Sequence, residues 1–257
     1  MFDDPLTLLF ICAMVFLSGL IDSIAGGGGL ISLPAYLFIG IPPHIAYGCN
    51  KFGSACGTTL SVLRFFRYGV LDVKVALTAA GGAFIGSAIG SQIVLFLNEQ
   101  TLKKFLLVLL PIAAFIILFK VRKTDERPVF DLPLKKRLIQ AVFVGTALGM
   151  YDGIFGPGCG TFAILAFTGI MGYDLRTSSG NAKALNLASN YASTITFMAA
   201  GTVDYSLAIP AAISCIIGNY IGSGLAIHKG ARFIRPTMIL VIVLLMAKII
   251  YDVVIGG

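Results

Sequence analysis

An internal repeat constrains this chain more than any other feature of its sequence. Gly48-x-x-Lys51 recurs as Gly180-x-x-Lys183, at an offset of 132 positions. Further matches follow in the same order at offsets of 132 or 130: Gly69-Val70-Leu71-Asp72 with Gly201-Thr202-Val203-Asp204, Gly86-x-x-Ile89-Gly90-Ser91 with Gly218-x-x-Ile221-Gly222-Ser223, and Asp22-x-Ile24-x-Gly26 with Asp152-x-Ile154-x-Gly156. Ordered matches at nearly one offset indicate a tandem duplication.

The composition predicts that both copies lie in a membrane. Of the 257 residues, 57% are hydrophobic and 12% are charged, and the mean hydropathy is +0.92. Such a chain has too little polar surface to cover a soluble globule. The net charge of +7 does not indicate a nucleic-acid partner, because seven of the nineteen Lys and Arg residues fall within residues 120–137. A basic stretch of this kind is typical of a cytoplasmic loop between membrane helices.

The apolar segments of the first copy predict its helices. A single straight helix over residues 6–40 would be about 52 Å long, whereas the hydrocarbon core of a bilayer is about 30 Å thick. The chain must therefore turn at the glycines between these limits. The segments that result cover about residues 6–22, 29–40, 45–67, 72–97 and 101–121.

Five passes per copy would invert the second copy relative to the first. The predicted fold is an all-α polytopic membrane protein with two inverted repeats of about five segments each, or eight to ten in total when short broken helices are counted. The predicted units are a first repeat over residues 1–122, a basic cytoplasmic linker over 123–137 and a second repeat over 138–257.

Loop charge supports the inversion independently. The connection that holds Arg64, Arg67 and Lys74 is basic, whereas its counterpart at residues 201–204 contains no Lys or Arg. Equivalent loops are therefore expected on opposite sides of the membrane. Both terminal tails lack basic residues, so both termini are predicted to lie outside.

The breaks in the apolar segments are candidate binding elements. In inverted repeats with interrupted helices, free backbone N–H groups and positive helix ends point toward a midplane site, which favours an anion. Turns or close helix packing are the alternative explanation for any single glycine. The first break contains Gly26, Gly27, Gly28 and Gly29, and the second contains Gly156, Pro157, Gly158 and Cys159.

Two lysines at equivalent positions lie inside apolar segments. A lysine at the bilayer centre costs about 2.5–3.5 kcal/mol, so Lys51 and Lys183 are expected to mark a water-filled path or a paired charge. Snorkelling of both side chains to the interface is the alternative. Neutral hydrogen-bonding residues at helical spacing could contact an oxyanion beside the lysines or simply join helices; they are Asn50, Ser54, Thr58, Asn186 and Asn190.

Two acids precede the breaks. Asp22 and Asp152 could carry a coupling proton, pair with a lysine or cap the following segment. Capping or pairing is the favoured interpretation, because one carboxylate beside a glycine turn serves both purposes without a coupling ion.

The remaining chemistry-bearing residues predict neither catalysis nor metal binding. Five cysteines form no CxxC pair, Trp is absent and only two His are present. We therefore predict no catalytic residue, no metal site and no cofactor. Lipid-facing and partner-facing apolar surfaces have the same composition, so no oligomeric state is predicted.

The glycine-rich break, the Gly-x-Asn-Lys segment and its altered Gly-Asn-x-Lys counterpart resemble those of the TauE/SafE family of sulfite and organosulfonate exporters. The resemblance covers nearly the whole chain. The site that it implies consists of Asn50 and Lys51 with Gly26 to Gly29, and of Asn181 and Lys183 with Gly156 to Gly160. The resemblance also implies a secondary transporter that moves sulfite or an organosulfonate such as sulfoacetate across the bacterial inner membrane, with H⁺ or Na⁺ as the coupling ion. A transmembrane thiol-disulfide carrier and an anion channel are the alternative functions.

The charge pattern generates a topology prediction. A cysteine introduced at Thr124 should react with an impermeant thiol reagent from the cytoplasm, and one at Thr202 should react from the outside. Whole cells and inverted membrane vesicles provide the two directions of labelling. Labelling of both positions from the same side would contradict the inverted arrangement.

Overall fold

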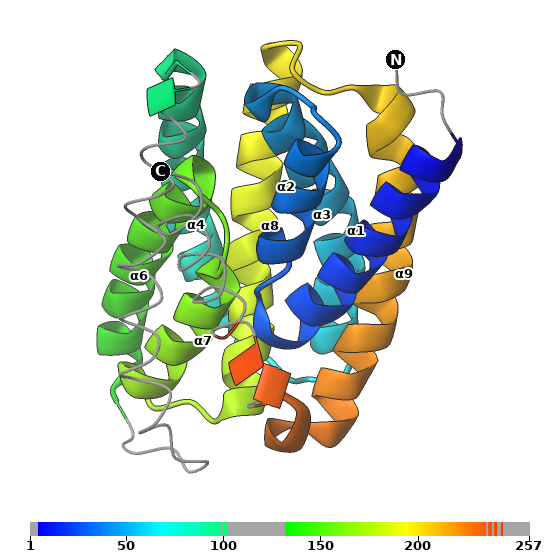
Figure 1. Ribbon diagram of the computed structural model, residues 1–257. Coiled ribbons are helices and arrows are strands. Elements are labelled where there is room, and N and C mark those ends of the chain that lie inside the picture. The colour runs from blue at the N-terminus through cyan, green and yellow to red at the C-terminus, as the bar shows by residue number, and fades with distance from the viewer. Residues whose placement is uncertain are drawn as a thin grey trace.

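The computed structural model describes residues 5–98, 100–101, 132–234, 236–237, 239–240 and 243. The regular elements of these ranges are helices (Figure 1). They are α1 (Pro5–Ala25), α2 (Gly29–Phe38), α3 (Pro43–Arg67), α4 (Val73–Phe96), α6 (Leu134–Ile154), α7 (Cys159–Gly169), α8 (Leu175–Ala199) and α9 (Tyr205–Lys229).

The first four predicted segments match α1 to α4 within a few residues. The predicted turn at the glycines is confirmed, because the chain reverses there and Ser32 at the start of α2 lies 3.1 Å from Ser18 of α1, Oγ to Oγ. The predicted segment 101–121 lies outside the described residues apart from its first position, as do residues 123–131 of the predicted linker. Helix α6 begins at Leu134, four residues before the predicted start of the second repeat.

Repeated caps define where the helices begin and end. The side chain of Asp72 accepts a hydrogen bond from Val75 N at the start of α4, and that of Asp204 accepts one from Ser206 N at the start of α9. Such N-caps satisfy N–H groups that have no partner within the helix. Helices α3 and α8 are each followed, two residues after their last residue, by a glycine of positive φ, Gly69 and Gly201. The two halves therefore use the same local signals.

Three of the described helices are long and apolar enough to cross a membrane: α1, α4 and α9. Helices α2 and α7 are apolar but shorter, with 10 and 11 residues. Helices α3 and α8 have 25 residues each, and polar residues on their buried faces lower their hydropathy. The protein is thus helical and of the polytopic membrane class.

Glycine contacts establish the directions of the outer helices. Gly82, Gly86 and Gly90 of α4 face successive turns of α6, at Val142, Thr146 and Met150. Because residue numbers rise together, α4 and α6 run parallel. In the same way Gly218 and Gly222 of α9 face Phe16 and Leu20 of α1, so these two helices also run parallel.

Helices α3 and α8 cross the middle of the bundle in opposite directions (Figure 1). Lys51 of α3 contacts Asn190 of α8, whereas Phe65 near the end of α3 lies beside Gly180 near the start of α8. Gly48 and Gly57 of α3 face rising positions in and before α9, so α3 runs with α9. Consequently α1, α3 and α9 run one way, and α4, α6 and α8 run the other.

Charge is concentrated at one end of this bundle, which we call the basic end. It holds the last turns of α3 and α9 and the first turns of α4, α6 and α8. Apart from Lys51 and Lys183, every Lys and Arg in the described ranges lies there: Arg64, Arg67, Lys74, Lys135, Lys136, Arg137, Arg176, Lys229 and Arg232. This asymmetry is the pattern expected for a cytoplasmic side.

The α4–α6 contact predicts a position-specific effect of a single methyl group. A Cβ at Gly86 would collide with the carbonyl oxygen of Thr146, whereas a Cβ at Gly81 on the same helix meets nothing within 4 Å. Gly86→Ala should therefore lower the free energy of unfolding by about 1–3 kcal/mol through overpacking, and Gly81→Ala should leave it within about 1 kcal/mol. Denaturation in detergent measures both; equal effects would contradict the proposed close approach.

Candidate functional site

The two glycine breaks meet at the centre of the molecule. Gly26 at the first break lies against the backbone of Gly160, and a Cβ at either position would overlap the other chain segment. Thr161 Oγ1 donates to Ala25 O over 2.7 Å, which satisfies a carbonyl at the end of α1. Gly26 and Gly156 adopt φ angles of +77° and +89°, which glycine tolerates without steric cost. The sequence thus brings two helix starts, those of α2 and α7, to one point.

Two ion pairs cross between the halves at this point. Lys51 Nζ of α3 lies 2.7 Å from Asp152 Oδ2 of α6, and Lys183 Nζ of α8 lies 2.9 Å from Asp22 Oδ2 of α1. Each lysine therefore pairs with the aspartate of the other repeat. The favoured expectation that the aspartates pair with the lysines agrees with this geometry.

Both pairs are shielded from solvent. The exposed fractions are 2% for the side chain of Lys51 and 0% for that of Lys183, against 8% for Asp152 and 18% for Asp22. In the described structure, therefore, neither of these two lysine side chains extends to a membrane interface. A buried charge is tolerated when an opposite charge and hydrogen bonds compensate for the lost hydration.

The two pairs differ in what else each lysine contacts. Lys51 Nζ donates to Asn190 Oδ1 over 3.3 Å and lines a small cavity. Lys183 Nζ instead donates a second hydrogen bond to the backbone oxygen of Asp22 and does not line that cavity. Lys51 is therefore placed to contact a ligand, whereas Lys183 holds the end of α1 next to α8.

The cavity beside Lys51 has a volume of about 20 Å³, enough for about one water molecule. Its wall combines carboxylates, a lysine, amides, a hydroxyl, a thiol and bare glycine backbone. The lining residues are Asp22, Gly26, Gly29, Asn50, Lys51, Ser54, Asp152, Gly156, Cys159, Gly160, Asn186 and Asn190.

Hydrogen bonds orient several of these groups. Ser189 Oγ donates to Asp152 Oδ2, so this carboxylate accepts from a hydroxyl as well as from Lys51. Ser32 Oγ of α2 donates to Asn50 Oδ1 over 2.6 Å, which fixes the amide beside Lys51. Asn186 Oδ1 is buried without a hydrogen-bond partner. That atom is an acceptor available to a water or a protonated ligand.

Most of the residues predicted from the sequence line this cavity. Four predicted glycine and amide positions do not: Gly27, Gly28, Gly158 and Asn181 are absent from the lining, as is Lys183. Gly28 N donates to Asp22 Oδ1 over 3.4 Å. Asn181 Oδ1 accepts from Asp72 N over 2.9 Å, near the basic end. The Gly-Asn-x-Lys segment predicted it as a site residue, but its side chain contacts the residue that caps α4.

Gly160 and Asn190 also line the cavity. Gly160 closes the second break, and Asn190 continues the spacing of Asn186 along α8 by one further turn. The i, i+4 spacing that made Asn190 a candidate places it on the same face of α8 as Asn186.

The Lys183–Asp22 pair predicts strong coupling in a double-mutant cycle. Lys183→Gln and Asp22→Asn should each lower the free energy of unfolding by about 3–5 kcal/mol, because each leaves one buried charge unpaired. The double variant should lose less than the sum, because it leaves none. Denaturation in detergent gives the four values, with the exposed Lys74→Gln as a control for loss of a positive charge. Additivity within about 0.5 kcal/mol would contradict the pairing.

Comparisons with known proteins agree with this architecture. The family model "Sulfite exporter TauE/SafE" matches residues 11–249. A probable membrane transporter protein, YfcA of Escherichia coli K12, is 32% identical over 252 residues, which cover 97% of this chain and 91% of that protein. A probable membrane transporter protein of Haemophilus influenzae is also 32% identical, over 97% of this chain and 96% of its own length.

A plant relative is similar over a shorter stretch. Sulfite exporter TauE/SafE family protein 3 of Arabidopsis thaliana is 27% identical over 88 residues, which cover 34% of this chain and 18% of that protein. No solved structure matches the chain. The family match spans the breaks, both lysines and both aspartates, and the chain belongs to the TauE/SafE sulfite exporter family, a family of membrane transporters rather than enzymes.

Proposed function

We propose that the protein moves a small sulfur-containing anion, sulfite or an organosulfonate such as sulfoacetate, across the bacterial inner membrane. The observation that carries the proposal is a buried lysine facing a central cavity. Lys51 meets the cavity where α2 and α7 begin. Helix N-termini present free N–H groups and partial positive charge, so the cavity offers three elements that attract an anion.

The composition of the cavity favours a weakly held oxyanion. Lysine supplies one compact positive charge, and the amides of Asn50, Asn186 and Asn190 add neutral hydrogen-bonding groups. The cavity lining contains no arginine, the residue that clamps phosphate in a bidentate manner. Moderate affinity suits a carrier, because the anion must also be released.

Alternating access by two inverted repeats accounts for both the helix directions and the size of the cavity. The opposed directions of α1 and α6, of α3 and α8, and of α4 and α9 support an inverted repeat. A cavity of about 20 Å³ is too small for the proposed anions, so the described state is a contracted one that must open. Rocking of one helical group against the other around a fixed midplane site would open it alternately to each side.

The position of the charged residues supports an orientation with the basic end in the cytoplasm. The start of α1 lies at the opposite end, which supports an N-terminus outside. The predicted outside location of the C-terminus concerns residues beyond the described ranges. The basic linker over 123–137 and the boundaries at residues 122 and 138 remain part of the proposal.

Asp152 provides a route for coupling to protons. In the described state its carboxylate is paired with the ammonium group of Lys51, so an anion that enters the cavity competes with this carboxylate for Lys51. Two negative charges beside one lysine in a dry site repel each other strongly. Protonation of Asp152 would remove this conflict and couple one proton to each anion bound. Na⁺ is the alternative coupling ion, and the carboxylates of Asp22 and Asp152 at the cavity are the oxygen ligands that it would use.

The other two functions receive less support. All five cysteines are free thiols, and Cys49 and Cys159 make unrelated hydrogen bonds, to Asp204 O and Leu148 O respectively. A thiol-disulfide carrier with a repeat-based cycle would place its thiols at equivalent positions. An open anion channel would need a continuous path, whereas the central cavity is contracted.

Lys51 and Asp152 should have opposite effects in one binding assay. Lys51→Gln should raise the dissociation constant for sulfite or sulfoacetate roughly five- to 150-fold, the equivalent of losing a charged contact worth about 1–3 kcal/mol. Asp152→Asn should increase ligand-induced stabilisation, because the anion then compensates an otherwise unpaired Lys51. Thermal unfolding across a ligand titration measures both effects.

Proton uptake provides the second readout of the same experiment. Anion binding in weak buffer should alkalise the medium with the wild-type protein and not with Asp152→Asn. Lys74→Gln, an exposed position at the basic end, should behave like the wild type. Wild-type ligand shifts in Lys51→Gln would show that the anion binds elsewhere. Unchanged proton uptake in Asp152→Asn would remove this residue from the coupling step.

A further inference from the structure

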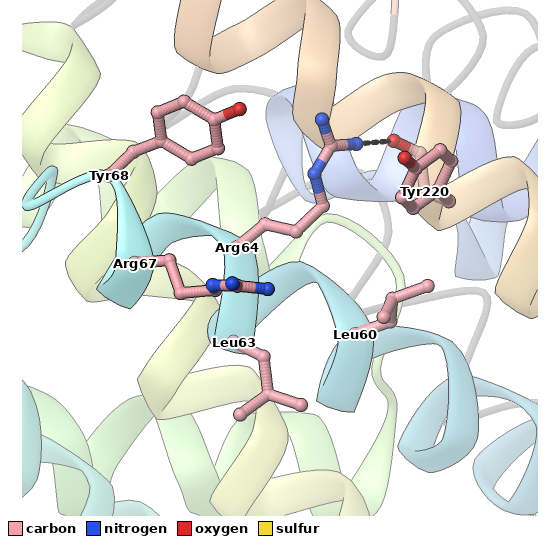
Figure 2. A pocket seen from close by; sticks show the side chains of 6 residues that line it. All are labelled: Leu60, Leu63, Arg64, Arg67, Tyr68 and Tyr220. Atoms are coloured by element: carbon pink, nitrogen blue, oxygen red, sulfur yellow. Dashed lines mark hydrogen bonds between the residues drawn. The ribbon is translucent and has the colours of Figure 1, made fainter.

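A second pocket lies on the outer surface of the bundle, at the basic end and away from the central cavity. It has a volume of about 620 Å³ and lies between α3 and α9. Figure 2 shows Arg64 reaching from α3 toward Tyr220 of α9, with the other lining residues along the same part of α3. Its lining consists of Leu60, Leu63, Arg64, Arg67, Tyr68 and Tyr220.

The pocket is graded in polarity along α3. Arg67 is the last residue of the helix, and Leu60 lies seven residues earlier, about 10 Å deeper at the helical rise per residue. Leucines therefore occupy the part nearer the bilayer centre, while Arg67 and Tyr68 occupy the part nearer the surface. Tyrosine is typical of this interfacial depth. The order matches a phospholipid, with an acyl chain below and a headgroup phosphate above.

Arg64 is fixed in the wall of this pocket. Its guanidinium donates to Tyr220 O and, over 3.3 Å, to Ser223 Oγ, and it lies 4.2 Å from the centre of the Tyr220 ring. A Cβ at Gly224 would approach the guanidinium at 3.0 Å, so a glycine there gives the group room to lie across α9. The pocket is thus preformed, and Arg67 adds a second, exposed positive charge.

The repeat supplies an internal comparison. The residues 132 positions away from the lining residues are all uncharged: Ala192, Ile195, Thr196, Ala199, Ala200 and, for Tyr220, Ala88. The duplicated architecture therefore carries the arginine pair at one end only. Anionic lipids give the cytoplasmic leaflet its negative surface potential, and the basic end is the proposed cytoplasmic side. Charge complementarity thus favours an anionic occupant of this leaflet.

We propose that this pocket binds an anionic phospholipid, with the phosphate between Arg64 and Arg67 and an acyl chain against Leu60 and Leu63. The leaflet assignment depends on the proposed orientation, whereas the pocket itself does not. This lipid proposal is independent of the central anion site, which lies at the meeting point of the glycine breaks.

Native mass spectrometry of the purified full chain tests this assignment. The protein should retain phosphatidylglycerol in preference to phosphatidylcholine of the same chain length. Arg67→Gln should weaken retention about fivefold, since a basic residue near a membrane surface is worth about 1 kcal/mol toward an anionic lipid. Lys74→Gln removes one positive charge from the same end but outside the pocket, and it should retain the lipid as the wild type does.

Two further arms separate a lipid from other occupants. Leu63→Gln keeps both arginines and should also weaken phosphatidylglycerol retention, and inorganic phosphate alone should not compete. Equal retention of both lipids, equal behaviour of Arg67→Gln and Lys74→Gln, or competition by phosphate would overturn the proposal. A further outcome would also overturn it: the protein is a dimer, and Arg67→Gln dissociates this dimer without changing the amount of bound lipid. The pocket would then be an interface between two copies. Sulfite binding to Arg67→Gln, measured separately, reports on the central site.

Discussion

Compensation of buried charge determines how the two halves of this protein fit together. Lys51 and Lys183 lie in a region where an unpaired ammonium group is strongly unfavourable, and each finds its aspartate on a helix of the other half. Separation of the halves would therefore leave four charges without partners in a low-dielectric interior. Each aspartate also lies close to a glycine break, so the same pairs bring the starts of α2 and α7 to the centre.

Close backbone packing makes this arrangement possible. Glycines on α4 and α9 let α6 and α1 approach until their carbonyl oxygens fill the space that a side chain would occupy. Such contacts between small residues are the usual way in which membrane helices associate, because lipid provides little hydrophobic driving force between them. Hydroxyls add to the contact between α4 and α8, where Ser87 Oγ lies 2.7 Å from Ser193 Oγ. The central helices α3 and α8 are thereby enclosed, and their polar residues face each other rather than lipid.

Equivalent sequence positions do not become equivalent sites. Lys51 and Lys183 match at the repeat offset, yet they differ in their contacts. Lys51 faces the cavity, whereas Lys183 donates to both the carboxylate and the backbone oxygen of Asp22. The ends of the bundle differ in the same manner, since the arginines near Tyr220 have uncharged counterparts in the other repeat. A duplicated fold in an asymmetric membrane meets different lipids and different compartments on its two sides. Divergence of the copies leaves one lysine beside a cavity, while the other binds the carboxylate and backbone of an aspartate.

The sequence by itself determined the helical membrane class, the extents of α1 to α4, the turns at the glycine breaks and the pairs of equivalent residues. These depend on local hydropathy, on glycine conformation and on an internal repeat, which are all visible along the chain. Tertiary structure decided which aspartate pairs with which lysine, that Asn181 faces Asp72 rather than the cavity, and that Gly160 and Asn190 complete the lining. The physical reason is that these contacts join residues more than 100 positions apart, and helical spacing fixes which residues share a face but not which neighbouring helix that face meets.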